Sequence, residues 1–140
     1  MTKLAVQDYP LAETRPEAIR GKRGLALSDI TLAAVLAGEV TMVDLQITPR
    51  SLQDQAEIAA DAGRAALALN FGRAAELVDV PQEVIMSTYE LLRPGRAKSR
   101  QELYDRATVF RDQYAAPQIA EFITEAADIY EKRGLFTYRF

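Results

Sequence analysis

Apolar residues recur every three or four positions along most of the chain, and this spacing places them on one face of an α-helix. The longest stripe of this kind runs from Leu52 to Leu77, and small residues fill its middle. Gly63 lies among them, although glycine inside a helix costs about 1 kcal/mol relative to alanine. It marks either close packing of another backbone or a break between two helices. We favour close packing, which predicts that Gly63→Leu costs about 1–3 kcal/mol by overpacking.

Residues that start and stop helices divide the first half of the chain. Ser28 is a suitable N-cap and Gly38 a suitable stop, which predicts a helix between them. A single helical turn is expected over residues 41–45. Thr48 followed by Pro49 is a strong start signal, because the first helical position does not need an N–H group.

The second half of the chain carries similar signals. A helix that starts at Pro81 is expected to end at Arg93, because the next residue is a proline. Ser99 has the spacing of a capping box and starts another helix. A single helix over residues 100–133 would be about 50 Å long. Either Pro117 breaks it into two packed helices or the molecule is elongated.

The first 27 residues lack helical periodicity, because prolines and glycines interrupt them. We interpret residues 1–27 as an extended N-terminal arm and residues 28–140 as one helical domain. The arm cannot build its own core, so it lies on the helical body, lies on a partner or stays loose. The predicted fold is all-α, with about four to six helices and this extended arm.

The composition excludes most familiar classes of enzyme. The chain has 140 residues, a net charge of -3, and neither cysteine nor histidine. Thiolate nucleophiles, Cys-based zinc sites and Ser-His-Asp triads are therefore excluded. A mildly acidic chain also lacks the charge of a general nucleic-acid binder. We find neither a secretory signal nor an apolar run of the ~18 residues that a membrane helix needs, so we expect a cytoplasmic protein without membrane contact.

Acidic side chains provide the only metal-ligand pattern that we considered. Asp54, Glu57 and Asp61 share a helical face, and their carboxylates suit Mg²⁺ or Ca²⁺. The better interpretation is a solvated face whose carboxylates pair with Arg50 and Arg64. The same judgement applies to a second acidic group, Glu121, Glu125 and Asp128. We predict no catalytic residue and no metal or cofactor ligand in this chain.

Three other features suggest contact with another molecule. The densest basic patch consists of Arg93, Arg96, Lys98 and Arg100. These cations either complement a helix C-terminus or dock on an acidic partner. Asn70 lies in the apolar stripe beside Phe71, where it makes either a local hydrogen bond or a contact to a partner chain. The aromatic tail from Leu135 to Phe140 either folds back on its own helix or is buried against another subunit.

Several segments occur in the order found in one known family. The first third contains Asp8-Tyr9-Pro10-Leu11-Ala12, Ser28-Asp29-Ile30-Thr31-Leu32 and Gly38-Glu39-Val40. The central block contains Ile47-Thr48-Pro49, Asp61-Ala62-Gly63-Arg64, Asn70-Phe71, Arg73-Ala74-Ala75-Glu76-Leu77 and Val80-Pro81, followed by Leu92-Arg93-Pro94. With these motifs, residues 7–133 resemble the small (gamma) subunit of adenosylcobalamin-dependent diol and glycerol dehydratases.

The resemblance implies a reaction, cofactors and partners. Enzymes of this family convert 1,2-propanediol to propionaldehyde, or glycerol to 3-hydroxypropionaldehyde, by radical chemistry. They contain two copies each of a large, a medium and a small subunit. Adenosylcobalamin lies between the large and medium subunits, and the large subunit holds the substrate and a metal ion. The small subunit is mainly helical, braces the large subunit and supplies no known catalytic residue. Some members are associated with bacterial microcompartments.

We predict that the interface with the larger subunits includes Tyr9, Pro10, Leu11, Asn70, Phe71, Arg93 and Arg96. The chain departs from the family at Gly95, where an aromatic residue is usual, and in its aromatic tail. These departures leave open a free-standing helical adaptor that binds another protein. A stand-alone metal enzyme that uses the carboxylates of residues 54–61 is the remote alternative.

Overall fold

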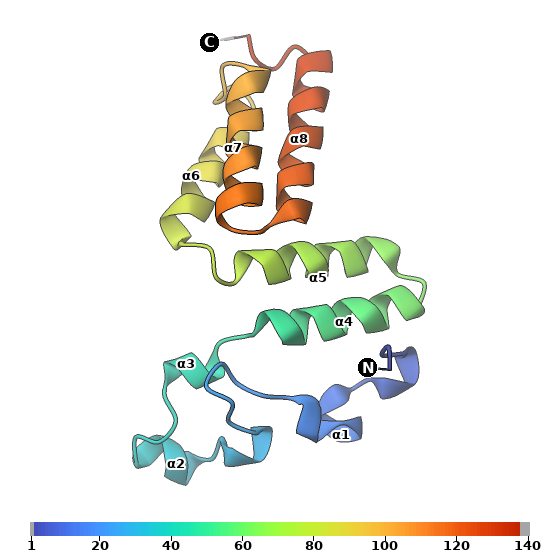
Figure 1. Ribbon diagram of the computed structural model, residues 1–140, viewed down its shortest axis with the longest axis vertical. Helices are drawn as coiled ribbons and strands as arrows, with labels where there is room; N and C mark the ends of the chain where they lie inside the picture. Colours follow the sequence, from blue (N-terminus) through green and yellow to red (C-terminus); the bar gives the residue numbers. More distant parts are fainter. Residues whose placement is uncertain (1, 138–140) are drawn as a thin grey trace. The chain divides into compact units, whose positions relative to one another are not determined.

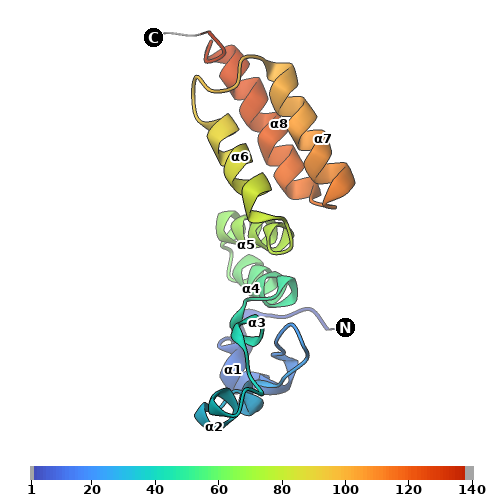
Figure 2. The ribbon, with the colours of Figure 1, turned by 90° about the vertical axis from the view of Figure 1, so that its left-hand side faces the viewer.

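The computed structural model describes residues 2–137, which pack as two units, residues 2–78 and residues 79–137 (Figures 1 and 2). Residues 2–27 belong to the first unit. The α-helices are α1 (Leu11–Thr14), α2 (Leu32–Leu36), α3 (Met42–Leu45), α4 (Pro49–Asp61), α5 (Ala65–Leu77), α6 (Gln82–Leu92), α7 (Arg100–Gln113) and α8 (Pro117–Lys132). The 3₁₀ turns are η1 (Val6–Asp8), η2 (Pro16–Ala18) and η3 (Leu27–Asp29). Residues 2–137 contain no strand beyond a single bridge between Arg20 and Ala26, so the predicted all-α fold is confirmed.

An antiparallel pair of helices, α4 and α5, occupies one side of the first unit (Figure 1). Helix α4 begins at Pro49, as predicted. The Thr48 hydroxyl caps it by accepting a hydrogen bond from the Ser51 amide at 3.2 Å. The apolar stripe over residues 52–77 is therefore divided between two helices, and the chain reverses direction between them.

Gly63 forms the reversal, and our expectation of close packing at this residue is wrong. Its φ is 73°, and a Cβ atom built on it would meet nothing within 4 Å. The Gly63 amide donates to the Ala60 carbonyl at 3.0 Å, and the Arg64 amide donates to the Ala59 carbonyl at 2.8 Å. This is the hydrogen-bond pattern of a Schellman C-cap, in which glycine is favoured because its backbone is left-handed. The alternative, a break between two helices, is correct.

The N-terminal segment packs on α4, so it is neither loose nor fully extended. Leu4 and Leu11 are buried together with Ile58 of α4. The turns η1, α1 and η2 occupy much of this segment. Asp8 stabilises them from within, because its carboxylate pairs with Arg15 at 2.8 Å. Prolines and glycines excluded long helices from this segment, as we predicted, but they did not exclude single turns.

Two short helices, α2 and α3, follow in sequence before α4. Ser28 does not cap α2, because it lies in η3. Thr31 is the cap instead, and its hydroxyl accepts a hydrogen bond from the Ala34 amide at 3.2 Å. Gly38 follows the end of α2 with a φ of 75°, as its predicted role as a stop requires. Helix α3 confirms the helical turn predicted over residues 41–45.

In the second unit, α7 and α8 form another antiparallel pair (Figure 2). The helical segment is interrupted before Pro117, which is the first residue of α8, so the alternative of two packed helices is correct. Ser99 caps α7 as predicted, by accepting a hydrogen bond from the Glu102 amide at 3.2 Å. Helix α6 ends just before Arg93, again as predicted. The most deeply buried apolar side chains of α7 and α8 are Leu103, Ala107, Phe110, Ala120, Ile123 and Ala127.

The aromatic tail can be followed as far as Thr137. The Phe136 and Tyr130 rings meet in a T-shaped arrangement with 6.2 Å between centroids, so Phe136 folds back on α8. Tyr138 and Phe140 lie outside the described residues. No helix within residues 2–137 has the length and apolar character needed to cross a membrane.

Candidate interaction surface

Glu57 and Asp61, two of the three carboxylates considered as metal ligands, hold the N-terminal segment on α4. Glu57 Oε2 accepts a hydrogen bond from the Leu4 amide at 2.9 Å. Asp61 Oδ2 accepts one from the Val6 amide at 2.8 Å. Over residues 2–137, no group of three or more acidic side chains is placed to hold a metal ion. The Glu57 and Asp61 carboxylates therefore fix the backbone of the N-terminal segment. They do more than form the solvated ion-pair face that we predicted.

Asp54, the third carboxylate, is buried on α4 and only 5% exposed. Arg50 Nε lies 2.8 Å from Asp54 Oδ1, which confirms the predicted ion pair. The alignment of the two groups does not make a hydrogen bond, so Oδ1 is buried without one. Burial raises the pKa of Asp54 above its ordinary value, and the Arg50 charge opposes that rise only in part. Asp54 is thus a buried structural charge in the first unit.

Most of the large apolar side chains around α2 and α3 are exposed. All five residues of α2 are apolar and none is buried; Leu32 is 75% exposed and Leu36 is 79% exposed. A helix that is apolar on every side is normally covered by other protein. We define the α2–α3 surface as the exposed large apolar side chains of this segment, which are Leu27, Leu32, Val35, Leu36, Met42, Val43, Leu45 and Ile47. Such a concentration of exposed apolar groups is typical of an interaction site.

Ile19 packs against the apolar core of the first unit, and polar contacts add to the hold on the segment that carries α2. No side chain in residues 12–39 is buried. Arg23 Nε donates to Asp44 Oδ1 at 2.8 Å, Nη2 donates to Asp44 Oδ2, and Nη2 also donates to the Glu39 carbonyl at 2.9 Å. We call this arrangement the Arg23–Asp44 clamp. Hydrogen bonds from Arg23, and from the Thr41 amide at 2.8 Å, lower the pKa of Asp44 to about 2. The clamp joins the segments on both sides of α2 and so preorganises the α2–α3 surface.

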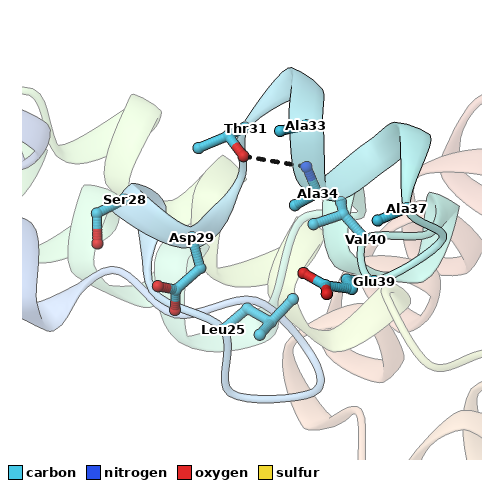
Figure 3. Close-up of a pocket in the computed structure, with 9 residues that line it drawn as sticks. All are labelled: Leu25, Ser28, Asp29, Thr31, Ala33, Ala34, Ala37, Glu39 and Val40. Carbon is cyan, nitrogen blue, oxygen red and sulfur yellow. Dashed lines mark hydrogen bonds between the residues drawn. The ribbon is translucent and has the colours of Figure 1, made fainter.

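A pocket of about 580 Å³ lies beside α2 (Figure 3). Its lining residues are Leu25, Ser28, Asp29, Thr31, Ala33, Ala34, Ala37, Glu39 and Val40. In Figure 3, the Leu25 side chain lies between the carboxylates of Asp29 and Glu39. The lining contains no lysine or arginine, so the pocket is both apolar and acidic.

The predicted interface residues of the first unit differ in exposure. Tyr9 is 63% exposed and Pro10 is half-buried, whereas the Leu11 side chain is buried in the core of the unit itself. Asn70 is exposed on α5, so its amide is not the buried polar group that the stripe suggested. Phe71, beside it, is half-buried. Their contact with a partner stays a prediction, and for Leu11 it would have to involve the backbone.

Two cations of the basic patch form ion pairs within the second unit. Arg93 pairs with Glu90 at 3.1 Å, and Arg100 pairs with Asp128 at 2.7 Å. Arg96 is exposed. Docking of Arg93 and Arg96 on a partner stays a prediction.

The α2–α3 surface was absent from our predicted interface. A signal for it exists in the sequence, because the run from Ile30 to Gly38 contains no charged residue. We interpreted Leu32, Val35 and Leu36 in this run as the apolar face of a helix and did not assign that face to an interface. Spacing shows that a face is apolar, but it does not show which molecule covers that face.

Comparisons with known proteins establish the family. A family model described as dehydratase small subunit matches residues 4–137. The chain belongs to the dehydratase small-subunit family. It is 46% identical to the propanediol dehydratase small subunit of Citrobacter freundii over 128 residues, which cover 91% of this chain and 74% of that protein. It is 45% identical to the propanediol dehydratase small subunit of Salmonella typhimurium (strain LT2) over 128 residues, which cover 91% of this chain and 73% of that protein.

Membership in the dehydratase small-subunit family confirms the resemblance seen in the sequence. A small subunit of a dehydratase has partner subunits, and the α2–α3 surface is the kind of surface that such partners cover. Contact with a partner subunit would therefore explain why the apolar residues of α2 are not covered by this chain itself.

Proposed function

We propose that this dehydratase small subunit is a non-catalytic brace for the larger subunits of a diol dehydratase. Those subunits convert 1,2-propanediol to propionaldehyde and water, or glycerol to 3-hydroxypropionaldehyde and water. The named relatives, small subunits of propanediol dehydratases at 45–46% identity, support the propanediol reaction. The assembly in this proposal contains two copies each of a large, a medium and a small subunit, and works in the cytoplasm or in a bacterial microcompartment.

One observation supports a bracing role above all others: every residue of α2 is apolar and none of them is buried. Covering it with another subunit removes apolar area from water, which is the main driving force of association. Acidic side chains that were candidates for chemistry have structural roles instead, as the contacts of Glu57 and Asp61 with backbone amides illustrate. The chain therefore contributes contact surface and rigidity, and it is inactive alone.

The cofactors of the proposed assembly do not fit the residues of this chain. The chain contains no histidine or cysteine, the side chains that bind transition metals most readily. The pocket beside α2 is lined by short apolar and hydroxyl side chains and two carboxylates. In the proposal, adenosylcobalamin and an active-site metal ion are held mainly by the larger subunits, and the residues of this chain take part in no step of the reaction. Its role is to stabilise the protein that encloses the radical chemistry.

Reconstitution tests the proposal. The large and medium subunits of a propanediol dehydratase would be co-expressed with and without this chain, purified, and assayed for aldehyde formation from 1,2-propanediol and from glycerol after addition of adenosylcobalamin. We expect the chain to co-purify with the other subunits, and we expect a complex lacking it to lose activity or to inactivate faster. Equal activity and equal lifetime without the chain would contradict a bracing role.

A free-standing helical adaptor remains the competing function, because Gly95 and the aromatic tail depart from the family pattern. Gly95 has a φ of 82° with no atom within 4 Å of a built Cβ, so its departure has a local conformational reason in the turn before α7. This observation weakens the adaptor hypothesis. An adaptor would fail to co-purify with the dehydratase subunits in the same experiment.

A further inference from the structure

The pocket beside α2 combines two properties that together specify the chemistry of a partner. Alanine side chains, Leu25 and Val40 give it an apolar wall, and Asp29 and Glu39 place carboxylates on it. Asp29 Oδ2 accepts a hydrogen bond from the Ala26 amide at 2.9 Å, which orients this carboxylate through a local turn. The guanidinium of Arg23 is engaged by the Asp44 carboxylate and by the Glu39 carbonyl. The pocket thus offers negative charge that no lining cation neutralises.

An apolar wall with carboxylates on it matches the side chain of lysine or arginine. These side chains place a hydrocarbon stem against apolar surface and keep a charged head at a polar group. The exposed apolar residues of α2 beside the pocket match an apolar segment that carries such a cation. Shape and charge therefore point to one kind of occupant, an apolar protein segment with a protruding cationic side chain.

We propose that the pocket lined by residues 25–40 receives a lysine or arginine side chain from a larger dehydratase subunit, while the α2–α3 surface packs on the apolar residues around that cation. The inference rests on the proposed function, because it names the partner surface that this small subunit recognises. In this inference the α2–α3 surface supplies most of the binding affinity. The two carboxylates fix the position of the partner on that surface and select for a cationic side chain.

A second copy of this chain is a poorer occupant than a larger subunit. Two copies that paired through the same surface would be related by a two-fold axis and would face each other with identical patches. Such a pair would bring the Asp29 and Glu39 carboxylates of both copies to one interface. Like charges placed together at an interface oppose association, so the acidic pocket disfavours this pairing.

The test measures the affinity of the purified small subunit for a complex of the large and medium subunits prepared without it, at low and at high salt. The test variant is D29N/E39Q, which removes both pocket charges and keeps the side-chain shapes. The control variant is E121Q/E125Q, which changes the net charge equally on exposed residues of α8. We expect D29N/E39Q to weaken binding about fivefold at low salt and much less at high salt, because salt screens the lost interaction. The control should bind like the wild type at both salt concentrations.

A second variant, L32S/L36S, tests the apolar half of the proposal. Both leucines are largely exposed, so the melting temperature of the free chain should not change. We expect its binding to the larger subunits to weaken at least tenfold, with the same loss at low and high salt because the lost contact is apolar. Unchanged or tighter binding by D29N/E39Q, or unchanged binding by L32S/L36S, would overturn the inference.

The outcomes also separate this inference from the proposed function. If the wild-type chain fails to bind the larger subunits at all, the proposed function falls and the inference falls with it. If the wild-type chain binds and the two variants bind equally well, the function stands and only the assignment of the surface is wrong. If the free chain dimerises and only L32S/L36S abolishes the dimer, the occupant is a second copy, and the inference is again overturned.

Discussion

Asp44 and Asp54 are both buried in the first unit, but their surroundings shift their pKa values in opposite directions. Asp44 accepts hydrogen bonds from Arg23 and from a backbone amide, which favour its charged form. Asp54 has an ion-pair partner in Arg50 but a carboxylate oxygen without a hydrogen bond, and burial disfavours its charged form. Hydrogen bonds from Arg23 thus lower the pKa of Asp44, whereas at Asp54 the cost of burial outweighs the attraction of Arg50 and raises the pKa.

Asp44→Asn is expected to destabilise the chain near neutral pH, because it removes the charged partner of Arg23. The folded pKa of about 2 lies below the ordinary value of about 4. The carboxylate therefore stabilises the fold fully above pH 4 or so, and this contribution is lost as pH falls through about 2. Urea denaturation at several pH values should show a lower midpoint for D44N at neutral pH and a smaller difference from the wild type near pH 2. A constant difference across that range would contradict the role of the clamp.

Asp54→Asn is expected to have the opposite effect. A raised folded pKa means that ionised Asp54 destabilises the fold, and that this penalty appears as pH rises through the unfolded pKa of about 4 and then through the higher folded value. D54N should therefore unfold at pH 7 with a free energy equal to that of the wild type or up to about 1 kcal/mol higher. Exposed Asp112→Asn is the control and should change nothing. If D54N instead lowered the free energy of unfolding by several kcal/mol, the Asp54 charge would be stabilised by its surroundings in the folded chain, which would contradict this prediction.

At the scale of elements, local signals predicted most helix boundaries. Thr48 with Pro49, Pro117 and Ser99 act through the backbone of their own turn, so they can be recognised without tertiary information. The prediction of Ser28 as an N-cap was wrong because Thr31, three residues later, is an equally suitable cap. The choice between two hydroxyl residues depends on the turn before α2, which a periodic pattern does not contain.

Gly63 shows why a periodic stripe does not reveal a helical hairpin. Spacings of three and four residues continue through the turn between α4 and α5, because both helices direct apolar residues toward each other. The pattern is therefore the same for one long helix and for two antiparallel ones. Only the backbone conformation at Gly63 distinguishes them, with a φ of 73°.

Gly63→Ala should destabilise the α4–α5 pair by about 1 kcal/mol, because an L-residue with a side chain disfavours the left-handed region. The same reasoning predicts a similar cost for Gly63→Leu, since a Cβ at this site meets no atom within 4 Å. Chemical denaturation of both variants measures the two costs. A cost for leucine several kcal/mol above that for alanine would restore the close packing that we first expected.

At the scale of the whole molecule, burial is unevenly distributed along the chain. Residues 12–39 have no buried side chain, whereas α7 and α8 contribute most of the deeply buried ones. The sequence could indicate the apolar character of both regions, but not that one is covered from within the chain and the other is left exposed. That difference depends on tertiary packing and on partner subunits, which are not encoded in local spacing.

Hydrogen exchange should make this uneven burial visible. In the free chain, amides of residues 12–39 should exchange faster than those of α7 and α8, because segments without buried side chains open at low free-energy cost. Addition of the larger dehydratase subunits should slow exchange in the α2–α3 segment and leave the already protected core amides of α7 and α8 nearly unchanged. Mass spectrometry of the peptides from both states measures the change. If residues 12–39 are as protected in the free chain as α7 and α8 are, the segment needs no cover, and its apolar surface loses its explanation as a subunit interface.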